Sequence, residues 1–490
     1  MTRTIAHYER IEQIGEGTYG QVYKARCMDT NEIVALKKIR VHHGGYWGMP
    51  PTVIREIKIL KRLRHPNLVQ MLEVVSSKGV EHLDEEDEVS EKHKSSKKDR
   101  VVDAREGFKG NLFLVLEYVS HDLTGLMDVA YRFSEVQVKC IFRQLLEALQ
   151  YMHDHKYVHR DIKSSNILID HNFRVKLADF GLARCLEPAI LDKIHDRGNS
   201  QEFTNKVITL WYRPPELLLG ETKYGTSVDI WSAGCILAEL ILGKPLFTGK
   251  TEMDQLKLIF EMIGTPTFES WGGFENLKLF RTGEVSIEAS KKPKFRHKYQ
   301  HKMPAPVLNL IEKLLELDPK KRLTASRALN SRYFLAEPKA PVRPEDLGTL
   351  EGHFHERQTK KMRKEAKALG EKARQTALEG GCSEKEAQEA FDETYRRIVA
   401  KVACEGLRIS SDPASTSSAK ASSKNEIPNK KRLDKDKRRE SHKEKHLDRH
   451  GRKDDARMRE GRDRNQKRKR RREDEGKPRK FTASSVEDGD

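Results

Sequence analysis

The sequence predicts an α+β protein with a β-rich front lobe and a helical back lobe. Strand-like runs come first, as in 33–39 (IVALKKI) and 112–119 (LFLVLEYV). Long runs with helical periodicity follow, at 136–154 and 228–243. Strands that precede helices in this way are typical of an α+β architecture. The globular pattern extends from about Tyr8 to Phe334, which is long enough for a core that needs no cross-links.

The first element with chemical content is the glycine-rich stretch GEGTYGQV, from Gly15 to Val22. Its pattern, G-x-G-x-x-G-x-V, lets two strands turn tightly and brings backbone N–H groups close to phosphate oxygens. On its own it fits an ATP loop, a dinucleotide site or a plain hairpin. A dinucleotide fold would continue into a helix and keep an acidic residue for the ribose. Here a second strand follows, and VALK places Lys37 17 residues beyond Gly20, which suits the α- and β-phosphates of ATP.

The next element, MPPTVIREIKIL (49–60), turns helical after Pro51. Glu56 lies on the same helical stripe as Val53 and Leu60. A carboxylate that faces a core costs several kcal/mol or loses its charge unless a cation meets it. Lys37, 19 residues earlier, is the expected cation. We therefore predict a Lys37–Glu56 pair that holds the lysine where it meets the nucleotide.

Two further motifs supply the chemistry of phosphoryl transfer. In HRDIKSSN (159–166), Asp161 can accept the proton of an incoming hydroxyl, Lys163 can neutralise the γ-phosphoryl group and Asn166 can hold a divalent metal ion. DFG (179–181) adds Asp179 as a second metal ligand. Each motif alone is weak evidence. The glycine loop, the strand lysine, the helix glutamate, HRDxxxxN and DFG in this order, followed by RPPE, make a chance match negligible.

With these motifs, residues 8–334 resemble a eukaryotic Ser/Thr protein kinase, and in particular a cyclin-dependent kinase. PPTVIRE stands where that family has its PSTAIRE-type helix, and VITLWYRPPELLLG (207–220) is similar to its activation-segment ending. DIWSAGCILAEL and LDPKKRLTA are similar to its later signatures. The resemblance implies a bilobal eukaryotic protein kinase fold, with the N-lobe at 8–119 and the C-lobe at 120–334.

The resemblance also implies the composition of the site. Asp229 and Arg322 would carry structural roles, with Arg322 as the partner of Glu216. Leu116 stands where relatives usually carry Phe, and it would widen the back of the adenine pocket. The expected catalytic residues are Asp161, Lys163, Lys37 and Glu56, and Mg²⁺ would be bound by Asn166 and Asp179. ATP would contact Ile14, Gly15, Glu16, Gly17, Thr18, Tyr19, Gly20, Val22, Ala35, Lys37, Leu116, Glu117, Val119, Asp122 and Leu168.

Regulation by a cyclin and by phosphorylation follows from the same resemblance. Thr204 would be the activating phosphosite, and its phosphate would add nearly two negative charges. Arg55, Arg160 and Arg184 could gather on that phosphate; the alternative is that they pair with nearby carboxylates. Thr18 and Tyr19 sit where some relatives carry inhibitory phosphates. The expected cyclin contacts are Pro51, Thr52, Val53 and Ile54, and proline at 51 and valine at 53 depart from the family's usual residues.

Substrate choice is implied by residues after the phosphosite. The family prefers Ser or Thr followed by proline, which has no N–H to satisfy. Ile208 and Arg213 fall at the positions that shape this pocket for the residue after the target, the +1 pocket.

The motifs look most like those of the transcription-elongation kinases partnered by cyclins of the T or K type, which implies the heptad-repeat tail of RNA polymerase II as substrate. The alternatives are a cell-cycle or splicing-related cyclin-dependent kinase, or a non-catalytic kinase-fold scaffold with an RNA-binding tail.

Two segments depart from a minimal kinase domain. Residues 76–110 hold an acidic block followed by a basic one and are expected to form a disordered insertion between two strands. Residues 335–407 form an extension, expected to be helical at 353–379 and 384–404. In the second helix, Ser383 and Glu386 make a capping box ahead of a stripe of Ala387, Ala390, Phe391, Tyr395, Ile398 and Val402. The run FHERQTKKMRKE (354–365) resembles a short basic extension that folds toward the nucleotide in relatives, which would bring His355 and Glu356 near ATP.

Residues 408–490 are expected to be a disordered Lys/Arg-rich tail. Residues 421–480 hold 26 Lys/Arg and 13 Asp/Glu, most of the chain's net charge of +18. The clusters at 429–439 and 466–472 resemble nuclear-import signals, so we expect a nuclear protein whose tail can bind RNA or acidic partners. The sequence predicts neither a secretion signal nor a membrane span. Its six cysteines form no metal or paired spacing, which fits a reducing compartment.

Overall fold

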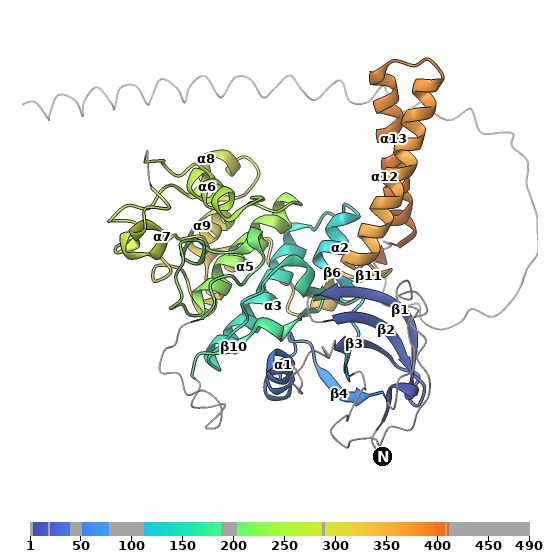
Figure 1. Ribbon diagram of the computed structural model, residues 1–490, viewed down its shortest axis with the longest axis horizontal. Helices are drawn as coiled ribbons and strands as arrows, with labels where there is room; N and C mark the ends of the chain where they lie inside the picture. The colour runs from blue at the N-terminus through green and yellow to red at the C-terminus, as the bar shows by residue number, and fades with distance from the viewer. Residues whose placement is uncertain are drawn as a thin grey trace, which may run out of the picture. The chain divides into compact units, whose positions relative to one another are not determined.

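The computed structural model describes residues 3–17, 20–39, 51–77, 112–187, 203–286, 290–406 and 409–410. Within these residues a β-rich lobe precedes a helical lobe, which confirms the predicted α+β class (Figure 1). None of the helices described is both long and apolar enough to cross a bilayer. The described cysteines are all free thiols, and only Cys382 among them is exposed.

The N-lobe is built on a sheet of five described strands in the order β1-β2-β3-β5-β4, with every neighbouring pair antiparallel. Ser76 pairs with Leu112, so the polar insertion joins two adjacent strands, as predicted. Most of that insertion lies outside the described residues. The strands are β1 (Tyr8–Gly17), β2 (Gly20–Cys27), β3 (Ile33–Ile39), β4 (Met71–Ser76) and β5 (Leu112–Glu117).

Helix α1 (Pro51–Arg62) packs beside the short 3₁₀ turn Phe180–Leu182, at the junction of the two lobes. A proline at the start of a helix costs no hydrogen bond, because the first turn has no acceptor for its N–H. Ile59 and Leu60 of α1 are buried, and Glu56 is 2% exposed among them. The apolar stripe of this helix therefore does carry its carboxylate inward.

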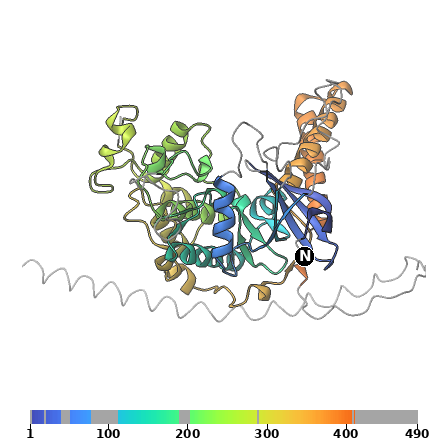
Figure 2. The same ribbon diagram turned by 60° about the horizontal axis from the view of Figure 1, so that its bottom comes forward.

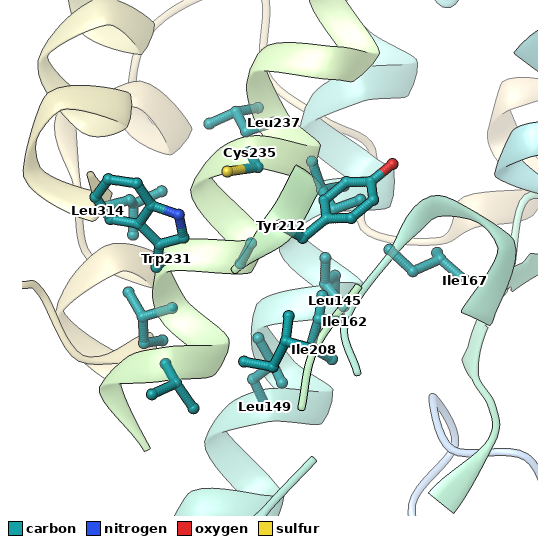
Figure 3. Packing of buried hydrophobic residues seen from close by; sticks show 14 of the residues in the cluster. Leu145, Leu149, Ile162, Ile167, Ile208, Tyr212, Trp231, Cys235, Leu237 and Leu314 are labelled. Carbon is teal, nitrogen blue, oxygen red and sulfur yellow. The ribbon is translucent and has the colours of Figure 1, made fainter. Parts of the chain in front are cut away.

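The C-lobe is organised around two helices with almost fully buried apolar faces, α3 (Glu135–Asp154) and α5 (Ser227–Leu242). Ser134 caps α3 through a capping box with Gln137. Figure 3 shows Trp231 of α5 beside Leu314, and Ile208 close to Leu145 and Leu149 of α3. The other helices are α2 (Leu123–Asp128), α4 (Pro215–Leu218), α6 (Glu252–Ile263), α7 (Lys278–Arg281), α8 (Phe295–Tyr299), α9 (Ala305–Leu314), α10 (Ala325–Leu329) and α11 (Arg332–Leu335).

Short strands in the C-lobe frame the predicted catalytic motifs. The segment 159–166 lies between β7 and β8, and the DFG motif follows β9. Strands β6, β8 and β9 form one small sheet, and β7 pairs with β10. Their bounds are β6 (His121–Asp122), β7 (Tyr157–Val158), β8 (Ile167–Ile169), β9 (Val175–Leu177) and β10 (Arg184–Cys185).

The C-terminal extension forms a helical hairpin of α12 (Glu356–Glu379) and α13 (Glu384–Gly406), which run side by side in Figures 1 and 2. The capping box of Ser383 with Glu386 is present. The stripe of α13 packs on α12, where the Phe391 ring lies against Gly370. The side chain of Val402 lies outside the described residues. Below the hairpin, β11 (Thr349–Leu350) pairs with β12 (Ile409–Ser410).

Candidate active site

Lys37 of β3 lies at the centre of a charged cluster between the lobes. Its Nζ is 2.7 Å from Glu56 Oε1 of α1 and 2.9 Å from Asp179 Oδ1 of the DFG motif. The predicted Lys37–Glu56 pair is therefore confirmed. The same ammonium also binds Asp179, one of the two predicted metal ligands, so three distant segments of the chain meet on one nitrogen.

Burial and charge act in opposite directions on this cluster. Burial opposes the charge of Lys37, but the carboxylates of Asp179 and Glu56 outweigh it, so the pKa of Lys37 lies above its ordinary value. Burial likewise opposes the charge of Asp179, but Lys37 and then Lys163 outweigh it and lower the pKa of Asp179 to about 2. Asp179 is thus ionised at neutral pH, as a ligand of a divalent cation must be.

Asp161 is held by three side chains. Lys163 Nζ lies 2.8 Å from its Oδ2. Asn166 Nδ2 donates to Asp161 Oδ2 at 3.0 Å and to its backbone oxygen at 2.8 Å, which leaves the Asn166 amide oxygen for a metal ion. Thr209 Oγ1 donates to Asp161 Oδ1 at 3.1 Å. The structure thus brings the predicted base, Lys163 and Asn166 together.

Asp229 of α5 binds the backbone of the catalytic loop, 159–166, through hydrogen bonds. Its carboxylate accepts the N–H groups of His159 and Arg160, each at 2.9 Å, and His153 Nε2 lies 2.9 Å from the same group. Arg160 has a backbone φ of 66°. Residues other than glycine rarely adopt this left-handed conformation, which costs about 1–3 kcal/mol. The buried carboxylate holds that strained conformation, which confirms the structural role expected of Asp229.

The glycine loop joins β1 and β2 through Gly17 and Gly20, which pair across the hairpin. Gly20 has a φ of 154°, and a Cβ there would lie 1.7 Å from Lys38 O, so no side chain fits. Thr18 and Tyr19 lie outside the described residues, and their predicted roles stay predictions.

Strand pairing brings four of the other predicted nucleotide contacts next to one another. Ala35 of β3 faces Leu116 of β5, and Leu168 of β8 pairs with Asp122 of β6. The Glu117 carboxylate is bound to Lys176 Nζ and to the N–H of Gln70, so its side chain is not available to a nucleotide. The remaining predicted contacts lie in β1 (Ile14, Gly15, Glu16), in β2 (Val22) and two residues after β5 (Val119).

Asp122 requires a correction, because its carboxylate does not face a nucleotide. It is 4% exposed, and its Oδ1 accepts the N–H of Gly125 at 2.7 Å, which caps α2. Its Oδ2 accepts the N–H of Glu356 at 2.8 Å, at the start of α12. Both oxygens are therefore occupied, Oδ1 by the cap of α2 within the C-lobe and Oδ2 by the link from the C-lobe to the extension.

The extension reaches the nucleotide lobe as the resemblance implies. His355 Nδ1 lies 3.5 Å from Asp122 Oδ2, beside the first residue of α12. From α12, Arg357 Nη1 lies 2.5 Å from Glu16 of the glycine loop, and Gln358 Nε2 donates to Glu12 of β1 at 2.7 Å. The run 354–365 thus spans from the C-lobe to β1 (Figure 1).

The predicted phosphosite, Thr204, is exposed, and its backbone oxygen accepts the hydroxyl of Tyr224 at 2.8 Å. That hydroxyl accepts Arg160 Nη1 at 2.9 Å, so one predicted arginine is already linked to Thr204. Arg184 lies in β10 and Arg55 on α1. Their gathering on a phosphate stays a prediction.

The predicted +1 pocket is defined by one backbone carbonyl. Ile208 has a φ of 64°, and its oxygen accepts Arg213 Nε at 3.2 Å and Arg213 Nη2 at 3.0 Å. Arg213 Nη1 lies 2.5 Å from Glu252 at the start of α6. Because Arg213 occupies the Ile208 oxygen, the pocket offers it to no substrate N–H.

One of the four predicted cyclin contacts is wrong in this arrangement. Val53 is 2% exposed and belongs to the core, because it shares the inward stripe with Glu56. Ile54 is 40% exposed and Thr52 is half-buried, so both are accessible to a partner. The side chain of Pro51 lies outside the described residues.

The buried ion pair of Arg322 with Glu216 is present, with both guanidinium-to-carboxylate distances at 2.6 Å. Arg322 Nε also donates to Glu316 O at 2.7 Å, and its guanidinium lies over the Trp231 ring. The expected structural role of Arg322 is confirmed.

Thr209 and Tyr224 contact the site but were not predicted from the sequence. Thr209 lies within VITLWYR, so a hydroxyl in the activation-segment ending was its only signal. Tyr224 had no local signal, because its contacts arise only when the loop between α4 and α5 folds against Arg160.

Comparisons with known proteins agree with this geometry. The family model for the protein kinase domain matches residues 8–334. The chain is 47% identical over 363 residues to cyclin-dependent kinase C-2 of Oryza sativa, covering 74% of this chain and 65% of that one. It is 44% identical to cyclin-dependent kinase C-1 of Arabidopsis thaliana (77% and 69% covered) and 41% identical to CTD kinase subunit alpha of Schizosaccharomyces pombe (72% and 53% covered). The chain thus spans about two thirds of the length of the plant relatives.

Two solved structures are similar to it. The yeast RNA Pol II CTD kinase CTDK-1 complex aligns with a TM-score of 0.56 and 37% identity, over 70% of this chain and 97% of the other. The CAK complex of Chaetomium thermophilum bound to ATP-gamma-S aligns with a TM-score of 0.55 and 37% identity, over 70% and 95%. The chain therefore belongs to the protein kinase family and, within it, to the cyclin-dependent kinases of the transcriptional branch.

Proposed function

We propose that this chain is a cyclin-dependent, proline-directed protein serine/threonine kinase that phosphorylates Ser/Thr-Pro sites in the heptad-repeat tail of RNA polymerase II. The observation that carries the proposal is the assembled site, in which Lys37 joins Glu56 to Asp179 while Lys163 and Asn166 flank Asp161. The substrate rests on the relatives, two of which are named as kinases of the CTD.

ATP and Mg²⁺ are the proposed cofactors, and the donor set fits them. Asp179 and Asn166 present a carboxylate and an amide oxygen, which are hard donors of the kind Mg²⁺ prefers. No cluster of three or more metal-ligating side chains occurs in the described part of the chain. Mg²⁺ bound to a nucleotide needs no such cluster, because it keeps waters and takes phosphate oxygens as ligands. When bound, the ion would neutralise charge on the transferring phosphates.

The residues around the nucleotide and the metal ion would each have a separate role in phosphoryl transfer. Lys37, oriented by Glu56, binds the α- and β-phosphates. Asp161 accepts the proton of the substrate hydroxyl as that oxygen attacks the γ-phosphorus, and ADP leaves with the bridging oxygen. Lys163, 2.8 Å from Asp161, stabilises the negative charge on the γ-phosphoryl oxygens.

Preference for proline after the target residue follows from the Ile208 carbonyl. A residue with an N–H at that position would lose its hydrogen bond to water and find the Ile208 oxygen already bound to Arg213. Proline has no N–H and loses nothing.

The proposed partner is a cyclin of the T or K type that contacts Ile54 and Thr52 and keeps Glu56 turned toward Lys37. Nuclear localisation and RNA or acidic partners are proposed for the tail, 408–490, which lies outside the described residues. A cell-cycle or splicing-related role is the alternative. The identity of the bound cyclin would distinguish that role from the proposed role in transcription.

Phosphotransfer to a Ser-Pro heptad-repeat peptide tests the proposal. The pure chain is compared with the chain bound to its co-purified cyclin, and activity is expected only in the complex. The blank is Asp161→Asn, which should lower kcat by roughly 10²–10⁴-fold because the base is lost, while ATP binding is retained.

Three results would count against parts of the proposal. Activity of Asp161→Asn equal to wild type would assign the base elsewhere. An active complex that ignores the heptad peptide but phosphorylates another Ser-Pro protein would remove the substrate and keep the kinase. Inactivity of the complex with Thr204 phosphorylated would favour a non-catalytic scaffold.

A further inference from the structure

The helical hairpin of α12 and α13 leaves apolar surface exposed. Where the two helices pack on each other, the buried residues are small: Ala366 and Gly370 of α12 and Ala387 of α13. The larger side chains of α12 stay outside, with Leu369 51% exposed and Leu378 38% exposed. Because helices in proteins are stabilised mainly by the packing of an apolar face, this hairpin has an apolar face that the described elements do not cover.

A groove of about 710 Å³ lies between the two helices. Its α12 side begins at Leu369, ends at Gly380 and follows the spacing i, i+3, i+4, i+7, i+8 and i+11, which is one helical stripe about 16 Å long. Its α13 side includes Arg397 and Ile398, and Cys382 lies at the end where the helices are joined. A groove of this form between two helices accommodates a third helix of about three turns.

The charged side chains that line the groove are both cations, Lys372 and Arg397. Neither pairs with a carboxylate in the part of the chain that the structure describes. Residues 356–379, which form α12, hold eight Lys/Arg against four Glu. The groove therefore combines apolar side chains with uncompensated positive charge, and a complementary partner brings apolar side chains and carboxylates.

A second copy of this chain fits the groove less well than such a partner. A two-fold contact brings the same patch of both copies together. Lys372 and Arg397 of each copy would then lie in one interface, and no Asp or Glu is among the described residues that line the groove. Like charges that face each other cost free energy, so charge disfavours this arrangement.

We propose that the groove binds an amphipathic, acidic helix of a partner protein. The apolar stripe of that helix lies against Leu369 and Ile398, and its flanking Asp or Glu side chains pair with Lys372 and Arg397. The partner is thereby attached to the kinase through α12, whose first turn binds β1 through Gln358. This surface is separate from the active site and from the proposed cyclin contacts, so a cyclin and this partner can bind together.

The test measures the binding of labelled peptides to the full chain with its cyclin, by fluorescence anisotropy at physiological salt. The peptides have about 18 residues, long enough for a helix. The first carries leucines at i, i+3, i+4, i+7 and i+8 flanked by Glu, the second has Lys in place of Glu, and the third is a scrambled form of the first. The first should bind at least about tenfold more tightly than the third, because burial of one leucine supplies that factor.

A matched pair of charge-reversal variants locates the binding. Lys372→Glu combined with Arg397→Glu should reverse the preference, so that the Lys peptide binds roughly threefold to tenfold more tightly than the Glu peptide. Lys361→Glu combined with Lys364→Glu makes the same change of charge at exposed positions of α12 that do not line the groove, and it should keep the wild-type preference.

A label on Cys382 locates the binding without altering the groove's charge. The other described cysteines are buried, and Cys404→Ser removes the thiol whose side chain lies outside the described residues. An environment-sensitive dye on Cys382 should shift its emission to shorter wavelength with the first peptide, because the bound helix excludes water from the groove. The scrambled peptide should cause no shift.

Other outcomes would overturn the inference. Equal binding of the first and third peptides would show general attraction to the basic residues of the chain. Equal loss of the first peptide in both charge-reversal variants, or no binding of any peptide, would remove the groove as its site. Self-association in sedimentation equilibrium that Leu369→Gln abolishes, without peptide binding, would assign the groove to a second copy.

Discussion

Three buried glutamates show two ways in which the free-energy cost of burying a carboxylate is offset. Glu56 has Lys37 as its partner, and Glu216 has the guanidinium of Arg322. Glu239 of α5 pairs with no cation among the described residues and instead accepts hydrogen bonds from the hydroxyls of Tyr212, at 2.8 Å, and Ser164. Burial therefore raises its pKa to about 7. Glu239 is therefore a proton-binding group of the folded state near neutral pH.

This difference predicts a pH dependence of stability. The pKa of Glu239 rises from 4.5 in a solvated chain to about 7 in the fold, so its contribution is complete below pH 4.5 and is lost as the pH rises through 7. Between pH 5 and 8 the wild type should lose about 2–3 kcal/mol of unfolding free energy more than Glu239→Gln, whose amide can still accept the Tyr212 hydroxyl. Urea unfolding at the two pH values measures this, and equal losses in both proteins would show that Glu239 is ionised throughout.

At the scale of elements, the activation segment is the part whose geometry depends on a modification. Arg160, Tyr224 and the Thr204 backbone already form a chain of hydrogen bonds beside the catalytic loop. A phosphate on Thr204 would add charge-assisted bonds to that chain.

Thr204→Ala should therefore lower kcat/KM of the cyclin complex by roughly tenfold or more, since one charge-assisted hydrogen bond contributes about 1.5–3 kcal/mol. Cyclin binding, measured by co-purification, should persist. Thr204→Glu should recover part of the loss, and an unchanged rate in Thr204→Ala would refute the arginine cluster.

The helical hairpin of α12 and α13 requires a residue without a side chain at position 370. A Cβ at Gly370 would lie 2.9 Å from the Phe391 ring, closer than side chains tolerate. Gly370→Val should weaken the contact between α12 and α13 by about 1–3 kcal/mol, the usual cost of overpacking. Ala368→Val, on the exposed face of α12, is the matched control. Faster amide exchange along α13 in the first variant only is expected, and equal exchange in both would show that the two helices do not depend on this contact.

At the scale of the whole molecule, the charge excess is concentrated in a part of the sequence that follows the catalytic motifs. Residues 421–480 account for +13 of the net +18, and every predicted catalytic residue lies before residue 204. Removing 411–490 should disturb nuclear retention and leave peptide phosphorylation within about twofold, because this segment holds the proposed nuclear-import clusters and none of the predicted catalytic residues. Imaging of the truncated chain and a peptide assay measure the two effects. A collapse of turnover would make the tail part of the catalytic unit.

The sequence by itself determined the lobes, the catalytic motifs and the pairing of Lys37 with Glu56. These rest on spacing along one strand, one helix or one loop, so the local pattern carries them. Only the tertiary structure decided the role of Asp122, whose second oxygen binds the N–H of Glu356, 234 residues later. It also decided that α13 packs on α12, where Phe391 lies against Gly370. The physical reason is the same in each case: a residue's partner across a long chain separation depends on how whole elements dock, and no local periodicity encodes that.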